Sequence, residues 1–363
     1  MRAECGECAE CAVKEPREFV VRRKPRLPGP LLSGKESGLS PFQWATGLVT
    51  THTRGRYALY HGVRALGLGS EDEVLVPEFH CMDIMDALQA SGVRVVFHRV
   101  KETSEVDLED LESRVTGRTR ALLIVHYFGL PQNSPELRDW CDRHGLFLIE
   151  DCAHSLFATL EGKPLGSWGD VSVFSILKTL PTQDGGLMVL KDPDRKYAFD
   201  ARRQRLRGLA KGAVKSLVLR RPAVMQAYEP AEEYLKMHPL SERALKCADA
   251  DGIASSRRRN YRYLAEALRD GELVVPYLPA LPEGACPFIF PVRVTRDVRR
   301  VHAELVIRGI PVCVFPGHLH PSLPRESFPL AWELADSLLA LPCHQDLSTA
   351  DLDRVVEIVR SVD

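Results

Sequence analysis

Long apolar runs, a strong net charge and several common catalytic signatures are missing from this sequence. No run approaches the roughly 18 apolar residues that predict a membrane span, and the formal net charge is −1. A near-zero charge argues against a general nucleic-acid binder, whose affinity depends on neutralising phosphates. The patterns GxxxxGK[ST], HExxH and GxSxG do not occur, which argues against P-loop NTPases, zincin metalloproteases and nucleophile-elbow hydrolases.

The N-terminus also lacks the apolar segment of a secretory signal, because residues 1–11 are polar and acidic. We therefore expect a cytoplasmic protein. Most of the 10 cysteines are scattered through apparent core segments, as expected for free thiols. Cys5, Cys8 and Cys11 have spacing that could ligate a metal. They have no fourth ligand nearby and precede a proline-rich stretch, so we favour a flexible tail over residues 1–30 and predict no metal site.

The middle of the chain alternates short apolar segments with amphipathic ones, which predicts an α/β domain with a mostly parallel sheet. This large domain is expected over residues 31–250, and a smaller α+β domain over 251–363. A basic stretch within 195–240 is interpreted as a solvated face in preference to a phosphate or acidic-partner contact. Strands are predicted over 74–77, 93–100, 121–128, 146–150, 288–294 and 312–315, and helices over 56–68, 81–90, 107–114, 135–144, 329–340 and 348–362.

Two charged residues stand out in the large domain because apolar strands surround them. Lys178 lies between the apolar segments 171–177 and 187–190, and Asp151 ends the predicted strand 146–150. This pair suits pyridoxal 5'-phosphate (PLP): a lysine amine forms the Schiff base, and a carboxylate holds the pyridine nitrogen protonated. At about 4 Å and an effective dielectric near 20, such an ion pair contributes roughly 4 kcal/mol, or about three pKa units.

The remaining needs of this cofactor also have candidates in the sequence. A phosphate is held by backbone N–H groups at a helix start, and Gly55 and Arg56 open the first predicted helix. Flat or apolar side chains suit the two faces of the ring. Phe79 or His80 is expected on one face and Ala153 on the other.

Several stretches, in this order and spacing, resemble the DegT/DnrJ/StrS-type sugar aminotransferases, which are fold-type I PLP enzymes. The resemblance implies that Lys178 is the Schiff-base lysine and the proton-transferring base, and that Asp151 pairs with the pyridinium. It also implies that His154 lies against the ring or near its phenolic oxygen, and that Ser175 binds the phosphate with Gly55 and Arg56. The matching stretches are 69–77, 125–129, 150–155, 166–170, 174–175, 184–186 and 328–342.

The sequence departs from the family pattern in three places. The phosphate loop has Arg56 where the family usually has Thr, so a cationic contact is expected in place of a hydroxyl one. Only two residues separate Ser175 from Lys178, where the family has more. The Asn-Tyr-Arg loop through which a neighbouring subunit touches the phosphate has no clear counterpart; Asn260–Arg262 is a weak candidate inside a helical pattern.

We therefore expect a homodimeric PLP-dependent aminotransferase, working by ping-pong half-reactions. Glutamate or glutamine would supply the amino group to the ketone of a nucleotide-linked sugar or related cyclic polyol, and His318 and His320 are predicted to contact substrate. Nucleic-acid and membrane partners are not expected. The alternatives are another PLP reaction on this fold, such as a dehydration, a non-sugar ketone as acceptor, or a non-catalytic regulatory relative.

Overall fold

The computed structural model describes residues 47–192 and 227–362, together with 21, 25, 194, 195, 197 and 199. Most of the proposed 1–30 tail, including its three cysteines, and much of the basic 195–240 stretch lie outside this range. Val21 is described, and it is buried in the core of the C-terminal half. Within it, no helix is long and apolar enough to cross a membrane.

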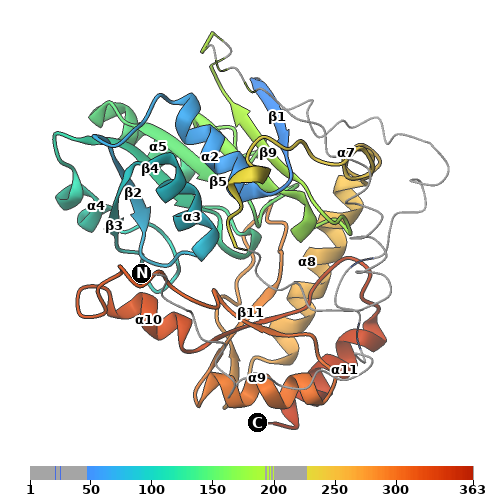
Figure 1. Ribbon diagram of the computed structural model, residues 1–363. Coiled ribbons are helices and arrows are strands. Elements are labelled where there is room, and N and C mark those ends of the chain that lie inside the picture. The colour runs from blue at the N-terminus through green and yellow to red at the C-terminus, as the bar shows by residue number, and fades with distance from the viewer. Residues whose placement is uncertain are drawn as a thin grey trace.

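A seven-stranded sheet forms the centre of the larger half of the molecule (Figure 1). Six strands run in one direction, and β9 alone runs the opposite way, pairing antiparallel with β8 and with the edge strand β1, so the predicted mostly parallel sheet is confirmed. In spatial order the strands are β1 (Leu48–His52), β9 (Gly186–Leu190), β8 (Val171–Ser175), β5 (Phe147–Asp151), β4 (Thr119–Val125), β2 (Glu73–Pro77) and β3 (Arg94–His98).

Helices cover both faces of this sheet, which explains why its strands are continuous apolar runs. Along β4, Ala121 and Leu123 belong to the core under α2 (Gly55–Ala65) and α3 (Met82–Ser91). Their neighbours Leu122 and Ile124 face the opposite core, under α4 (Leu108–Arg114) and α5 (Ser134–His144). Alternate side chains thus fill two separate layers.

Local signals account for the helix boundaries. Asp107 caps α4 by accepting from two backbone amides, and α5 has Pro135 in its first turn and Gly145 in the left-handed conformation after its end. Ser348 and Asp351 form a capping box at the start of α11 (Thr349–Arg360). The turn η2 (Tyr127–Gly129) follows β4, and η3 (Ile176–Lys178) follows β8.

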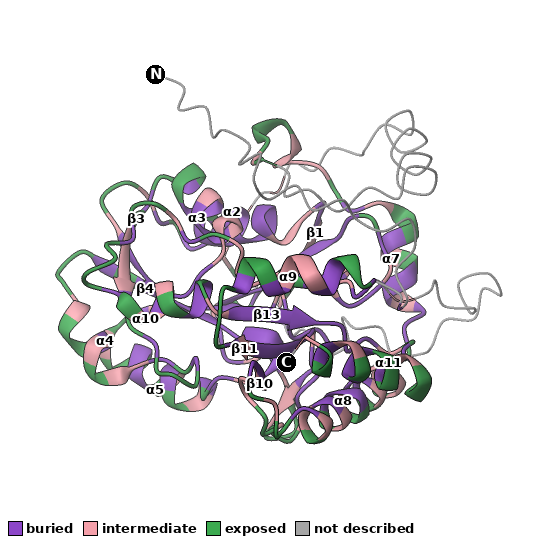
Figure 2. Ribbon diagram, turned by 90° about the horizontal axis from the view of Figure 1, so that it is seen from below, coloured by how far each residue is buried: buried purple, intermediate pink, exposed green. Residues whose placement is uncertain are grey.

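The described part of the C-terminal half contains a four-stranded antiparallel sheet and five helices. The strands are β10 (Val274–Pro276), β11 (Phe290–Val294), β13 (Leu338–Leu341) and β12 (Cys313–Val314), in that order. They are largely buried, whereas the neighbouring helices expose one side (Figure 2). The helices are α7 (Pro239–Lys246), α8 (Ala250–Ala267), α9 (Val298–Ile307), α10 (Pro329–Ala335) and α11; a short turn η4 (Pro230–Glu232) and the hairpin β6 (Thr159–Leu160) and β7 (Lys163–Pro164) complete the described elements.

The predicted helix over 329–340 is wrong in its second half. The helix α10 ends at Ala335, and Leu338–Leu341 form the strand β13, which pairs with both β11 and β12. Every residue of β13 is buried. A short, continuous apolar run has the same pattern in a buried helix and a buried strand, so periodicity alone does not separate the two.

Candidate active site

The pocket that contains most of the predicted cofactor residues lies beyond the carboxyl ends of the parallel strands, where α/β sheets bind ligands. Asp151 is the last residue of β5, Val125 the last of β4, and Phe79 follows β2 closely. Lys178 ends η3, the turn directly after β8. The pocket is lined by Phe79, His80, Cys81, Ile84, Val125, Tyr127, Asp151, His154, Lys178, Phe315 and Pro316.

Asp151 presents one carboxylate oxygen to this pocket without a hydrogen-bond donor from the described residues. The amide of Ala153 donates to Oδ1 at 2.8 Å, and no such bond reaches Oδ2. Burial raises the pKa of this carboxyl group, while Lys178 and the Ala153 amide act in the opposite direction. A cation bound beside Asp151 would lower this pKa and favour the ionised carboxylate.

Lys178 contributes a basic amine to the same pocket as the Asp151 carboxylate. Its Nζ lies 5.8 Å from the centre of the Phe288 ring and makes no hydrogen bond or salt bridge with any residue in the described ranges. The amine and the Asp151 carboxylate thus line one pocket while standing more than the 4.0 Å of an ion pair apart. An amine and a carboxylate that leave each other unpaired fit a cofactor with an electrophilic aldehyde and a basic ring nitrogen.

His154 is neutral and has a defined tautomer. Burial, together with the nearby Lys178, holds the pKa of this imidazole well below its usual range. The amide of Phe128 donates to Nδ1 at 3.3 Å, so the ring proton is on Nε2. The His154 ring stacks on Phe288, with centroids 5.0 Å apart and planes 19° apart, so its orientation is fixed before any ligand binds.

The predicted phosphate residues meet at the start of α2. A Cβ on Gly55 would contact the Ser175 Cβ at 3.4 Å, and a Cβ on Gly186 would meet the Arg54 carbonyl oxygen at 2.1 Å. The backbone therefore passes close to β8 and β9 at the first turn of the helix, where free N–H groups bind anions. Arg56 is buried and pairs with Asp83 at 2.8 Å and Asp86 at 3.6 Å in α3.

Ala153 differs from its predicted place on a ring face. It does not line the pocket and contributes its amide to Asp151 instead. Phe79 and His80 both line the pocket. His80 donates from Nδ1 to the Glu78 carbonyl at 2.8 Å and accepts the amide of His320 at Nε2 at 3.2 Å; burial lowers its pKa to about 4.

The two predicted substrate histidines occupy different environments. His320 contacts the pocket wall through His80 and pairs with Gln89 at 3.0 Å. His318 is exposed and does not line the pocket. Asn260 lies inside α8, buried, and donates to the carbonyl of His344 at 2.8 Å, so it is not on a loop that could reach a second subunit.

Two aromatic residues from the C-terminal half were missed. Phe315 lines the pocket and packs on Phe128 and His154, with centroids 4.8 Å and 5.5 Å away. Phe288 stacks on His154, as described above. The only sequence signal for Phe315 is the following Pro316, which marks a turn without indicating what the turn contacts.

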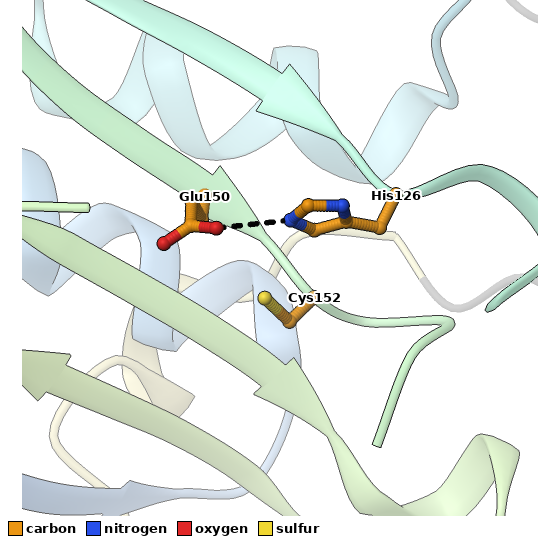
Figure 3. Close-up of side chains that lie close together, drawn as sticks. All are labelled: His126, Glu150 and Cys152. Carbon is orange, nitrogen blue, oxygen red and sulfur yellow. Dashed lines mark hydrogen bonds and ion pairs between the residues drawn. The ribbon is translucent and has the colours of Figure 1, made fainter. Parts of the chain in front are cut away.

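A buried cluster of His126, Glu150 and Cys152 has the composition of a metal site (Figure 3). The Glu150 carboxylate is already surrounded by donors, including His126 Nε2 at 3.1 Å and the amides of Trp168 and Gly169 at 2.9 Å and 2.6 Å. His126 Nδ1 accepts the Gln132 amide at 3.0 Å. These protein contacts occupy the ligand atoms of His126 and Glu150, so the cluster is a structural hydrogen-bond network.

A family model described as the DegT/DnrJ/EryC1/StrS aminotransferase family matches residues 36–360. The dTDP-3-amino-3,4,6-trideoxy-alpha-D-glucose transaminase of Streptomyces venezuelae is 30% identical over 353 residues, which cover 92% of this chain and 87% of that protein. GDP-perosamine synthase of Vibrio cholerae is 38% identical over 143 residues, a match that spans 39% of each chain.

Solved structures that resemble this chain have the same fold over most of its length. DesV of S. venezuelae, solved with a ketimine intermediate, has a TM-score of 0.70 and 27% identity and covers 93% of this chain and 90% of its own. The aminotransferase TlmJ of Streptoalloteichus hindustanus has a TM-score of 0.73 at 23% identity, covering 94% and 98% of the two chains. The fold class, the aminotransferase class and the PLP cofactor expected from the sequence are confirmed.

Proposed function

The chain belongs to the DegT/DnrJ/EryC1/StrS aminotransferase family, and on that premise we propose that it moves an amino group onto a ketone of a nucleotide-linked sugar. Glutamate or glutamine is the proposed donor. The relatives support the acceptor class, because their names describe dTDP-linked and GDP-linked amino sugars. The observation that carries the proposal is that Lys178 and Asp151 line one pocket while the Lys178 amine and Asp151 Oδ2 make no hydrogen bond with the described residues.

Lys178, Asp151 and His154 have separate chemical roles. PLP, when bound, supplies an electron sink that lets an amino group leave the donor and join the acceptor. Lys178 Nζ would hold the cofactor covalently, and its free amine would serve as the base that moves the proton at the reacting carbon. Asp151 keeps a proton on the ring nitrogen, and His154 offers its Nε2–H as a neutral donor.

The start of α2 is the proposed phosphate site. Gly55 and Arg56 supply backbone N–H groups at a helix N-terminus, and Ser175 lies against Gly55. The Arg56 guanidinium, paired with Asp83 and Asp86, fixes this turn against α3. Aromatic walls from Phe79 and Phe315 exclude water from the ring site.

Lys178 is tested by labelling. Purified protein with added PLP is expected to absorb visible light, and borohydride reduction followed by peptide mass spectrometry is expected to place the cofactor on Lys178. Lys178→Arg should abolish the label, whereas Lys163→Arg, at an exposed lysine, should retain it. A colourless wild-type protein, or a label on another lysine, contradicts the assignment.

The reaction is tested in two halves. Glutamate or glutamine alone should convert the bound cofactor to its amine form, and a dTDP-, UDP- or GDP-linked keto sugar should then restore it with a new C–N bond in the product. A product that has lost water and gained no nitrogen would indicate the dehydration alternative. The expected homodimer stays a prediction, which analytical ultracentrifugation tests.

A further inference from the structure

Arg257 in α8 is a buried cation with no acidic partner. Its side chain is 1% exposed, and no carboxylate of the described residues lies within ion-pair distance of it. Four hydrogen bonds reach neutral oxygens in three other segments. Nε donates to Gln345 Oε1 at 2.9 Å, one terminal nitrogen to the carbonyls of Pro287 at 2.8 Å and Phe288 at 3.0 Å, and the other to the Thr179 carbonyl at 3.2 Å.

Burying a guanidinium without a counter-ion is unfavourable for stability. An apolar side chain would fill the same place between α8 and the sheet at a lower desolvation cost. Arg257 differs from such a side chain in one useful respect: its planar fork of donors holds several carbonyl groups at fixed mutual positions. The identity of those carbonyl groups therefore indicates what the residue does.

The carbonyls of Thr179 and of Pro287 and Phe288 belong to two segments beside the cofactor pocket. Thr179 directly follows Lys178 in the chain, and its carbonyl also accepts from Gln345 Nε2 at 3.2 Å. Phe288 carries the ring that stacks on His154 and lies 5.8 Å from Lys178 Nζ. The Arg257 guanidinium thus holds the main chain at Thr179, next to Lys178, and the main chain at Phe288, whose ring lies near the Lys178 amine.

We propose that Arg257 is a positioning residue that sets where Lys178 Nζ stands relative to Asp151 and His154. The proposal rests on the function of Lys178 proposed above. Only two residues separate Ser175 from Lys178, so η3 is a single short turn. The Thr179 carbonyl after this turn is held by Arg257 and Gln345, whereas the Lys178 amine makes no hydrogen bond with the described residues.

The test compares Arg257→Met and Arg257→Lys with the control Arg259→Met, which removes an exposed arginine from the same helix. Three quantities are measured: the dissociation constant for PLP, the pH midpoint of the visible absorption of the bound cofactor, and the rate of its conversion by glutamate. Thermal unfolding of the cofactor-free proteins is recorded to establish that each variant is folded.

Both Arg257 variants are expected to bind PLP about tenfold more weakly and to react about 100-fold more slowly, the loss typical of a displaced reacting group. The pH midpoint should also move, because it depends on the distances from Lys178 Nζ to its charged neighbours. Arg259→Met should match the wild type in all three. Gln345→Ala removes the second link to Thr179 at a part-exposed position and should shift the same quantities less.

A purely structural role would lower the unfolding temperature of the Arg257 variants and leave the dissociation constant, midpoint and rate of the folded fraction unchanged; that result overturns the proposal. If Arg257→Met does not fold, the same three quantities measured on Gln345→Ala and Arg257→Lys test the proposal. Failure of the wild type to attach PLP to Lys178 would instead overturn the proposed function. The two failures are therefore distinguishable.

Discussion

Acid should weaken this fold through a stacked pair of buried histidines. His52 in β1 and His61 in α2 have ring centroids 4.9 Å apart and planes 24° apart, and both are fully buried. His52 bonds Thr50 Oγ1 at 2.8 Å; His61 bonds the Glu233 carbonyl at 2.9 Å and the Tyr197 hydroxyl. Burial holds the pKa of His52 well below its usual range, with His61 adding to the effect, and burial also lowers the pKa of His61.

The sign and size of the effect follow from proton linkage. The folded pKa of His52 lies below the unfolded value of 6.5, so below pH 6.5 the unfolded chain binds a proton that the folded protein excludes. The free energy of unfolding therefore falls as the pH falls, by about 1.4 kcal/mol per pH unit for each such group. Between pH 7 and pH 5, His52 alone accounts for at most about 2 kcal/mol.

Urea unfolding at pH 7 and pH 5 measures this loss, with His52→Phe as the perturbation. Phenylalanine keeps a ring against His61 but does not titrate, so the loss of stability between the two pH values should shrink, by up to about 2 kcal/mol. His318→Asn, at an exposed histidine, should lose as much stability as the wild type. If His52→Phe also loses as much as the wild type, the reasoning is wrong.

Three further substitutions test other parts of the structure. Asp151→Asn should leave the fold intact and reduce turnover at least 100-fold, because a neutral amide does not hold the ring proton, whereas Asp139→Asn on the surface should be neutral in a turnover assay. Arg56→Ala should lower the free energy of unfolding by about 1 kcal/mol and weaken PLP binding, both measurable by titration, because it breaks the ion pair with Asp83. Glu150→Gln should lower stability by about 3 kcal/mol in urea unfolding, since its amide would face donors such as His126.

The sequence predicted the mostly parallel sheet and its covering helices well because their signals are local. Each strand from β2 to β5 is a short, mainly apolar run that ends at, or directly before, a polar residue, and the helices between them carry recognisable caps. Parallel connections then require those strands to share one carboxyl edge. That single constraint is enough to bring Asp151 and the chain after β2 into one region, before any contact between side chains is known.

The contribution of the C-terminal half was not predictable in this way. Phe315 lines the pocket and Phe288 stacks on the pocket residue His154 because both pack against η2, and no periodic pattern encodes that contact. Arg257 was not recognised for a different reason, because its sequence pattern predicts the wrong environment. It opens a run of three arginines inside an amphipathic helix, which predicts a solvated face, yet it is the one of the three that points into the protein.

Backbone contacts between the two halves limit how this pocket opens. The amide of Phe288 donates to the Phe128 carbonyl at 2.7 Å, and the amide of Cys286 donates to the Gly129 carbonyl at 3.1 Å. Gly129 has φ +89, and a Cβ there would meet the Cys286 carbonyl oxygen at 2.1 Å, so the approach needs glycine. Since the Phe128 amide also orients His154, swinging the C-terminal half away would disturb the cofactor site itself. The turn η2 and residues 286–288 are therefore joined into one side of the pocket, and the catalytic geometry depends on both halves of the chain.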